Sequence, residues 1–403
     1  MKFSKLSQLF LVSIIGLLVA TLLTSCAIVT IDYVFVGNAA GSGVGSAGQI
    51  QTFDADSETG ALRSGAATVP SGGINPVSMA TTANYSNLYV VNQGSNNVVH
   101  FSISGSGVLT QKDVVTTSAT PVFVTVNTAE TYLYVVSGPN PSVLTAYSLS
   151  SGTIGSVAAK VTLTLPGYPT DTIVPTGVNV LANNGAVYVS AYDLSAYNPG
   201  GVTTSTANPG WVFGYTVGSG GALALSSDSP YKAGVKPSAL ASDPTSRFLY
   251  VTDFASNEII GYTIQSGSTL DFLINGPFKT GNEPNAITID PRGKYIYISN
   301  ELDSTVSAFV IDLSTGTPSA AVNVTGSQQN STDTTPVAII VDPALGRFVY
   351  TANLQGNSVS GFVLNPTTGA LKSTQSAPYP TGDQPSALAS VPHGNHSIQT
   401  VSP

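Results

Sequence analysis

The sequence repeats one unit along almost its whole length, and this repeat constrains the fold more than any other feature. Each unit opens with a proline and a short apolar segment, passes a polar turn, and continues into a segment that ends in Tyr-Val or a similar pair. A third apolar segment and a Gly-x-Leu turn follow. Proline cannot donate to a sheet ladder, so it suits the first residue of a strand. The units recur about every 50 residues, as four-stranded propeller blades do, and open at Pro76, Pro121, Pro175, Pro237, Pro284, Pro336 and Pro385.

One large aromatic residue marks the second strand of every unit, and these residues count the blades: Phe35, Tyr89, Tyr134, Tyr188, Tyr250, Tyr297 and Tyr350. A ring at this position fills the wedge between neighbouring sheets, which widens away from the axis. Phe35 has no proline segment before it, whereas Pro385–Ser390 has no tyrosine segment after it. We therefore expect the C-terminal segment to provide the innermost strand of the first blade, which removes the open sheet edge. The sequence predicts an all-β, seven-bladed β-propeller over residues 31–391, closed by the pairing of its terminal strands, and a tail at 392–403.

The third strands carry a second regularity, a small residue or threonine just before their aromatic residue. Six units follow it, at Thr52, Ala146, Gly214, Gly261, Ala308 and Gly361. His100 stands at this place in the remaining unit. We interpret His100 as a side chain that fills a gap between blades. The other two histidines, His393 and His396, lie beyond the last predicted strand.

The N-terminus predicts the compartment. Lys2 and Lys5 precede an apolar run from Leu9 to Leu23, which is typical of a secretory signal peptide at residues 1–25. The run ends in Leu-Thr-Ser-Cys, which resembles the bacterial lipobox, so we expect Cys26 to be lipidated and residues 26–30 to form a short linker. An ordinary signal peptide with an incidental cysteine is the alternative. Ala27 rather than aspartate follows the cysteine, which favours a lipid anchor in the outer membrane of a Gram-negative cell envelope.

Composition excludes several classes of function. Loss of residues 1–25 removes two lysines and no acid, so the net charge of −8 becomes −10 and nucleic acid is not an expected partner. Cys26 is the only cysteine, so no disulfide can form within the chain. Asp54, Asp56 and Glu58 resemble calcium ligands, but they coincide with a turn and lack the later glutamate of such loops. Gly43–Gly48 matches a dinucleotide pattern but precedes a strand rather than a helix. We therefore predict neither a metal nor a cofactor.

The repeats resemble the β-propeller lactonase family, which includes 6-phosphogluconolactonase and carboxymuconate cyclase, with the YVTN-type propellers as close relatives. The best stretch runs from Glu283 to Val306 and contains Asp-Pro-Arg-Gly-Lys-Tyr-Ile-Tyr and then Asn-Glu-Leu. This resemblance covers residues 31–391 and implies a seven-bladed fold and hydrolysis of a lactone, a cyclic carboxylic ester. Where the family blade has Arg-His after its proline, this chain has Asn285 and Ala286. Of the residues usual in the family site, only Glu301 is matched.

Three charged residues near the axis are the candidates for catalysis. Glu301 is the carboxylate that the resemblance implies. Lys236 and Glu283 precede neighbouring strand prolines and are the only charges in that ring, where they either pair or line a polar channel with Glu301. Lactone hydrolysis needs a base to activate water and a cation or donors for the developing oxyanion. Glu301 would act as the base, with Lys236 or backbone donors in support.

A second candidate site lies on two long loops of one unit. Residues 165–174 precede Pro175, and residues 191–210 follow the second strand of the same unit, so both loops belong to one propeller face. Long loops on a rigid scaffold often carry function, although unselected drift would also lengthen them. The loops bring together side chains suited to sugar or peptide contact, namely Tyr168, Asp171, Tyr192, Asp193, Tyr197 and Trp211.

Three functions remain open on the sequence alone. The first is a non-catalytic envelope module that binds a glycan, peptide or protein through its loop-rich face. The second is an extracytoplasmic lactone hydrolase that uses Glu301. The third is an envelope spacer with no small ligand. The absence of the family's Arg-His pair favours the binding module.

Overall fold

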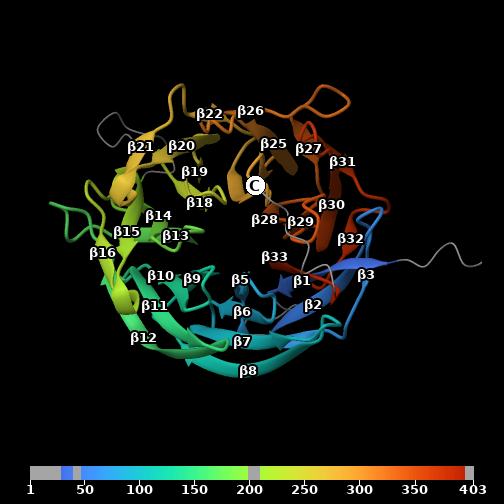
Figure 1. Ribbon diagram of the computed structural model, residues 1–403, viewed down its shortest axis with the longest axis horizontal. Helices are drawn as coiled ribbons and strands as arrows, with labels where there is room; N and C mark the ends of the chain where they lie inside the picture. The colour runs from blue at the N-terminus through green and yellow to red at the C-terminus, as the bar shows by residue number, and fades with distance from the viewer. Residues whose placement is uncertain (1–28, 40–46, 198–208, 395–403) are drawn as a thin grey trace, which may run out of the picture.

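The computed structural model describes residues 29–39, 47–197 and 209–394, which form seven antiparallel sheets around one axis (Figure 1). The all-β, seven-bladed prediction is confirmed, with strands from Thr30 to Pro392. Helix within these ranges is confined to two short 3₁₀ turns, η1 (Ser219–Gly221) and η2 (Ser266–Ser268). No described helix is long and apolar enough to cross a membrane. Cys26 and the expected signal peptide lie outside the described residues.

The two inner strands of each sheet form the regular part of a blade. The innermost strands surround the axis: β33 (Pro385–Pro392), β5 (Pro76–Thr81), β9 (Pro121–Val126), β13 (Ile173–Val180), β18 (Pro237–Ser242), β23 (Pro284–Ile289) and β28 (Pro336–Val341). The second strands pair with them in the same order: β1 (Thr30–Asn38), β6 (Asn87–Asn92), β10 (Tyr132–Ser137), β14 (Ala186–Asp193), β19 (Phe248–Asp253), β24 (Tyr295–Asn300) and β29 (Phe348–Asn353). The expected prolines open six of the innermost strands, whereas Pro175 is the third residue of β13.

The outer strands are less regular. The third strands are β2 (Ala47–Asp56), β7 (Asn97–Ile103), β11 (Val143–Ser150), β15 (Gly210–Val217), β20 (Glu258–Ile264), β25 (Thr305–Ile311) and β30 (Ser358–Leu364). Two blades end in a continuous strand, β8 (Leu109–Thr116) or β12 (Thr153–Thr162). In the other five the outermost strand is split in two: β3 (Leu62–Ser64) and β4 (Val69–Ile74), β16 (Leu223–Leu225) and β17 (Tyr231–Lys232), β21 (Leu270–Phe272) and β22 (Phe278–Lys279), β26 (Pro318–Ala320) and β27 (Gln329–Ser331), β31 (Leu371–Ser373) and β32 (Tyr379–Pro380).

The ring closes through its terminal strands, as the sequence predicts. β33 pairs antiparallel with β1, and Ala389 lies opposite Phe35. The first blade therefore takes its innermost strand from the C-terminus and its other strands from the N-terminus. This pairing satisfies the inner edge of β1, which would otherwise expose unpaired backbone groups.

The seven aromatic residues of the second strands are completely buried, and each faces the regular third-strand position across the ladder. Phe35 lies opposite Thr52, and Tyr134 lies opposite Ala146. Glycine stands opposite Tyr188, Tyr250 and Tyr350. A bulky ring beside a small residue fills the gap between two blades without a clash.

His100 is the exception, and the structure shows how its blade accommodates it. The imidazole is 3% exposed and stacks on the Tyr89 ring, with the ring centroids 5.1 Å apart. Its Nδ1 lies 2.6 Å from Asp113 Oδ1, and its Nε2 lies 2.8 Å from Asn87 Oδ1. His100 is thus a packed, hydrogen-bonded component of the blade interface.

Five of the tyrosines also tie their blade to the next one. Each hydroxyl donates a hydrogen bond of 2.5 to 2.9 Å to a backbone carbonyl in the third turn of the following blade: Tyr89 to Gly152, Tyr188 to Ser268, Tyr250 to Gly316, Tyr297 to Gly369 and Tyr350 to Gly60. The last of these bonds joins residues 290 positions apart and crosses the closure of the ring. Tyr134 differs, because its buried hydroxyl has no partner among the described residues.

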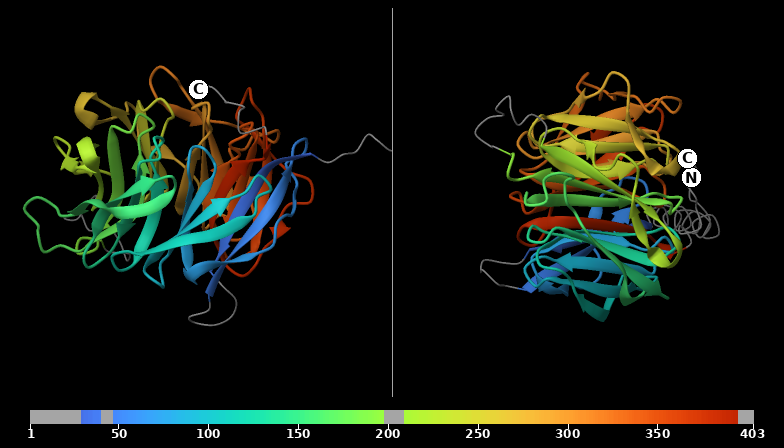
Figure 2. Two further views of the ribbon diagram at one scale, coloured as in Figure 1. Left: turned by 60° about the horizontal axis from the view of Figure 1, so that its bottom comes forward. Right: turned by 90° about the vertical axis from the view of Figure 1, so that its left-hand side faces the viewer.

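The disc has two distinct faces (Figure 2). We call the "turn face" the side with the turns between first and second strands and between third and fourth strands. The "loop face" carries the turns between second and third strands and the loops that lead into the next innermost strand. On the turn face, Asp243 Oδ1, Asp290 Oδ1 and Asp342 Oδ1 each accept two backbone N–H groups, which fixes three of the turns.

Asparagine side chains fix the loop face. Asn257 Oδ1 accepts a hydrogen bond of 2.8 Å from the backbone N–H of Glu283, which leads into the next blade. Asn96 and Asn357 make the same contact to Thr120 and Gln384. Each asparagine therefore joins a turn of one blade to the loop that begins its neighbour, and this contact holds the loops around the axis in place.

The interblade hydrogen bond yields a prediction with a matched control. Tyr350→Phe should lower the free energy of unfolding by about 1–2 kcal/mol, because it removes a buried hydrogen bond and leaves the Gly60 carbonyl without that donor. Tyr134→Phe should cost nothing or stabilise the protein, because it removes a buried hydroxyl without a described partner. Urea unfolding of the two variants beside the wild type measures the difference. Equal losses in both variants would contradict the role of the hydroxyl.

Candidate functional site

The central channel has an apolar wall. Its lining comes from the innermost strands and includes Val77, Met79, Phe123, Leu240, Ile287, Val337, Ile339 and Leu388. A polar ligand would lose its hydration inside such a channel without gaining hydrogen bonds in return. Polar chemistry is therefore expected at the end of the channel, where the loop face surrounds it. We call this end the channel mouth.

Lys236 is the cation of the channel mouth, and aromatic rings surround it. Its backbone N–H donates to Asp253 Oδ1 at 2.9 Å, which fixes the loop before Pro237. The ammonium group lies 4.1 Å from the centroid of the Phe254 ring and 5.8 Å from that of Tyr197. Cation–π contacts of this kind hold the side chain over the rings. Phe254 follows β19 on the loop face, and the sequence patterns did not indicate it as a site residue. Its position directly after Asp253, the last residue of a second strand, could have indicated that it lies on this face.

Glu283 and Glu301 lie on adjoining loops of the next blade. The backbone N–H of Glu301 donates to the Glu283 carbonyl oxygen at 2.8 Å. Asn285 Nδ2 donates to Glu301 Oε2 at 2.5 Å, so Asn285 orients the carboxylate. Glu283 adopts φ +55°, a left-handed conformation that its bond from Asn257 supports. No ion pair among the described residues joins Lys236 to either glutamate.

The two long loops identified in the sequence, before β13 and after β14, contact each other on the same face as Lys236. The backbone N–H of Leu194 donates to the Thr172 carbonyl oxygen at 2.8 Å. Desolvation and the charge of the neighbouring Asp193 carboxylate raise the pKa of Asp171. The rings of Tyr192 and Tyr197 meet edge to face, with centroids 5.3 Å apart. Tyr197 thus links the two predicted groups, because it contacts both Tyr192 and the Lys236 ammonium.

Two predicted ligand residues lie away from this cluster. Tyr168 is 64% exposed near the tip of its loop. Trp211 belongs to the third strand β15, where it lies opposite Ala191 and Lys232 and packs against the core shared by two blades. The Lys232 ammonium lies 3.6 Å from the Trp211 ring centroid. The structure therefore places Trp211 on the blade wall rather than with Tyr192 and Tyr197.

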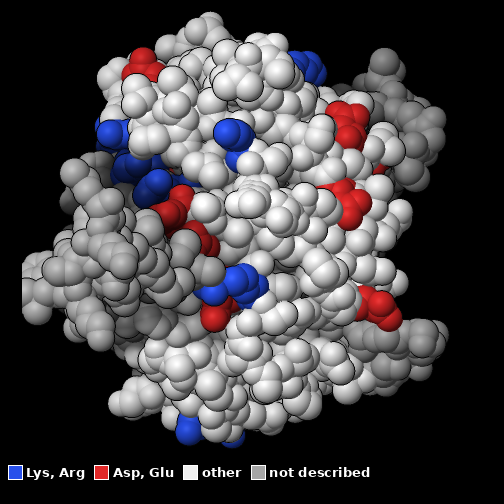
Figure 3. Space-filling view, turned by 90° about the vertical axis from the view of Figure 1, so that its right-hand side faces the viewer, with Lys and Arg blue, Asp and Glu red and all other residues white. Residues whose placement is uncertain are grey.

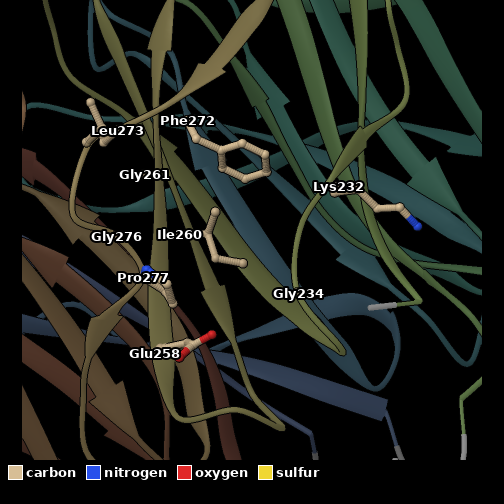
Figure 4. A pocket seen from close by; sticks show the side chains of 9 residues that line it. All are labelled: Lys232, Gly234, Glu258, Ile260, Gly261, Phe272, Leu273, Gly276 and Pro277. Carbon is tan, nitrogen blue, oxygen red and sulfur yellow. The ribbon is translucent and has the colours of Figure 1, made fainter. Parts of the chain in front are cut away.

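A separate groove lies between the outer edges of two blades (Figure 4). It forms where the outermost strand is split between β21 and β22, and its lining includes Lys232, Glu258, Ile260 and Phe272. The Lys279 ammonium pairs with Glu258 at 2.9 Å at its edge. None of the predicted site residues lines this groove, so it is distinct from the channel mouth.

The side chains of the channel mouth can bind a polar ligand and polarise its bonds, but few of them are suited to proton transfer. In the described ranges no cluster of three or more His, Cys, Asp or Glu side chains could hold a metal ion. The described histidines lie elsewhere, His100 between blades and His393 against Tyr33 near the ring closure. What converges at the mouth is one ammonium group, aromatic rings and carboxylates.

The seven-bladed ring, the apolar channel and the charged mouth place this protein in the class of β-propellers, in which a ligand site can form at one end of the central axis. The chain belongs to the lactonase family: the family model described as "Lactonase, 7-bladed beta-propeller" matches residues 103–398. No curated protein sequence matches the chain.

Solved structures with the same fold include proteins with lactonase names. The periplasmic gluconolactonase PpgL of Pseudomonas aeruginosa is 18% identical, with a TM-score of 0.70 over 90% of this chain and 99% of that protein. A candidate 6-phosphogluconolactonase of Bacteroides uniformis is 19% identical, with a TM-score of 0.71 over 90% and 99% of the two chains. At this identity the likeness establishes the fold alone.

The Asp171–Asp193 contact predicts a pH-dependent loop. The pKa of Asp171 is raised in the folded protein, so the folded state favours the protonated carboxyl group. This contribution to the stability of the loop is complete below about pH 4, the ordinary pKa of an aspartate, and is lost as the pH rises through the raised pKa of Asp171. Asp171→Asn keeps a donor at every pH. Hydrogen exchange should therefore show that protection of the Leu194 amide falls with pH in the wild type but not in Asp171→Asn. Parallel pH trends in both proteins would contradict this assignment.

Proposed function

We propose that this protein is a lactonase-fold binding module of the cell envelope, and that its channel mouth holds a hydroxyl-rich ligand of the sugar or sugar-acid class. The observation that carries the proposal is the position of the Lys236 ammonium over Phe254 and beside Tyr197, with the carboxylates of Glu301 and Asp193 on other loops of the same face. Aromatic rings pack against the C–H faces of a sugar. Carboxylates accept hydrogen bonds from its hydroxyl groups, and an ammonium group pairs with a sugar-acid carboxylate.

The arrangement favours binding over hydrolysis. A lactonase needs a base beside its water and a donor where the oxyanion develops. Here the carboxylate of Glu301 already accepts a hydrogen bond from Asn285, and the ammonium of Lys236 lies over aromatic rings. No described ion pair couples the two residues. These side chains are arranged to contact a ligand rather than to pass a proton.

Lactone hydrolysis is the second candidate, and one observation favours it. Glu301 is the residue that matches the family site, and Asn285 holds its carboxylate in a single orientation at the mouth. The solved gluconolactonase of Pseudomonas aeruginosa shares the fold. In this mechanism Glu301 would take a proton from water, and Lys236 would stabilise the oxyanion after reorienting its ammonium group.

Binding and turnover can be separated with two probes, D-gluconate and D-glucono-1,5-lactone. Lys236→Met should weaken gluconate binding by roughly tenfold or more, because about 1.4 kcal/mol of ion pairing corresponds to that factor. Glu258→Gln, on the outer groove, should leave the affinity unchanged. Calorimetry measures both. Unaltered binding by Lys236→Met would exclude the mouth as the gluconate site. Lactone turnover that Glu301→Gln abolishes would establish the hydrolase instead.

We also propose that the protein is exported and lipid-anchored through Cys26, with the outer membrane as its location. The lipobox-like sequence and the absence of any other cysteine support this. Expressed in a Gram-negative host, the chain should incorporate labelled palmitate and sediment with outer membranes. Cys26→Ser should lose the label. Palmitate incorporation that persists in Cys26→Ser, or never occurs in the wild type, would refute the anchor.

A further inference from the structure

We infer that the turn face of the propeller lies against an anionic lipid bilayer and that the channel mouth points away from it. This orientation rests on the proposed anchor at Cys26, and it specifies which surface of the protein meets the membrane. Two independent observations lead to it: the position of Val29, three residues after Cys26, and the distribution of charge between the two faces.

The first observation is a covalent limit. Val29, the first described residue, lies on the turn face, where its carbonyl oxygen accepts a hydrogen bond of 2.9 Å from Ser57 in the turn after β2. From there β1 runs towards the loop face. Cys26 precedes Val29 by three residues, so its Cα lies within about 11 Å of the Val29 Cα in any conformation. A lipid on Cys26 therefore enters the bilayer close to the turn face.

The thickness of the disc separates the mouth from this anchor. The second strands of most blades have six residues, and a strand of that length spans about 20 Å. The linker is too short to carry the anchor around the disc to the opposite face. A bilayer that holds the lipid of Cys26 thus meets the turn face first.

The second observation is the position of the arginines. All four arginines of the chain lie on or beside the turn face: Arg63, Arg247, Arg292 and Arg347. In three successive blades an arginine follows the buried turn aspartate. The carboxylates of Asp243, Asp290 and Asp342 are covered by backbone N–H groups.

The exposed charge of this region is therefore positive. Arg292 is engaged with Asp290 at 2.7 Å, whereas Arg247, Lys294 and Arg347 are exposed. We call these three exposed residues the basic arc. The arc runs through three successive blades, and the last of them, which carries Arg347, adjoins the blade that carries Val29. The tether and the basic arc therefore belong to the same face of the disc.

The loop face is mainly acidic, apart from lysines such as Lys236 and Lys279. Its acids include Glu283, Glu301, Asp303, Asp333 and Asp383, of which the last three follow one another around the rim. In Figure 3 most Lys and Arg lie on the left half together with some acids, whereas the right half shows mainly Asp and Glu. At physiological ionic strength charges are screened beyond about 8 Å. Only the charges of the face that touches the bilayer therefore interact strongly with its anionic lipids. These lipids repel the acidic face, so that face is more stable when it points away from the bilayer.

The turn face also has acids: Glu58 and Asp312 in outer turns, Asp271 beside another, and Glu130 in the inner turn between β9 and β10, where it contacts Asn84. None of these acids belongs to the inner turns that carry the basic arc. Each basic side chain near an anionic surface adds a modest attraction. A covalent lipid keeps the arc at the surface, so these small attractions become intramolecular and set the orientation. The consequence is that the channel mouth opens to the aqueous phase, where a soluble ligand reaches it directly.

The orientation can be measured because the chain has one cysteine and one tryptophan. Residues 26–403 contain every described residue, and Cys26 can be coupled to a maleimide lipid in vesicles of phosphatidylcholine and phosphatidylglycerol. In a Trp211→Phe background, Leu313→Trp places a probe on the turn face, and Leu302→Trp places one on the loop face of the same blade. Both leucines are exposed, by 44% and 66%. Brominated acyl chains then quench whichever probe contacts the bilayer.

We expect the emission of Leu313→Trp to be quenched and that of Leu302→Trp to be unaffected. Replacement of Arg247, Lys294 and Arg347 by glutamine should reduce the quenching of Leu313→Trp in anionic vesicles. The charge-matched replacement of Lys112, Lys160 and Lys279 should not. Quenching of Leu302→Trp equal to or greater than that of Leu313→Trp would overturn the orientation. No quenching of either probe would also overturn it and would leave the turn face to a protein partner.

This test is independent of the proposed anchor and of the proposed ligand. Chemical coupling replaces the cellular lipidation that palmitate labelling examines, and no ligand is present. A quenching result that contradicts the orientation can therefore be distinguished from a negative result in palmitate labelling or in gluconate binding.

Discussion

The structure depends on filling the wedge between radially arranged sheets. Flat blades that meet at an axis diverge as they run outwards, and the space between them must be occupied at close to crystal density. One fully buried ring in every second strand does this, opposite a small third-strand residue or threonine in six blades and opposite His100 in the other. In five blades a tyrosine hydroxyl adds a hydrogen bond to the next blade, so the ring that fills the gap also sets the register between neighbours. The pairing of β33 with β1 makes this set of interfaces continuous.

The same blade interfaces position the candidate site. Asparagine side chains such as Asn257 tie the turn of one blade to the loop that begins its neighbour, so the mouth is assembled from loops that the ring itself aligns. Lys236 and Glu301 therefore lie on loops of the same face although they belong to different blades. Their surroundings differ, because aromatic rings hold the ammonium and an amide holds the carboxylate.

The two faces of the disc differ in chemistry because their connections differ in length and in how their backbone groups are hydrogen-bonded. Turn-face connections are short and use buried aspartates to satisfy backbone N–H groups, and the basic residues that follow are held at the surface. Loop-face connections surround the axis and vary in length, so their side chains can change without loss of the ring. A ligand site on one face and a membrane contact on the other are compatible with one rigid scaffold.

The sequence by itself determined the number of blades, the closing strand and the wedge residues, because each is a local pattern that recurs with a fixed spacing. It also indicated the mouth, since Lys236, Glu283 and Glu301 hold fixed places relative to the strand prolines. Only the tertiary structure decided which of these side chains meet. Trp211 and Tyr197 flank one long loop, yet Trp211 faces a blade core and Tyr197 approaches Lys236. Phe254 and Asn285 complete the mouth without a distinctive motif. Whether two side chains meet across blades depends on how the sheets twist and pack, and a repeat within each blade does not encode that distance.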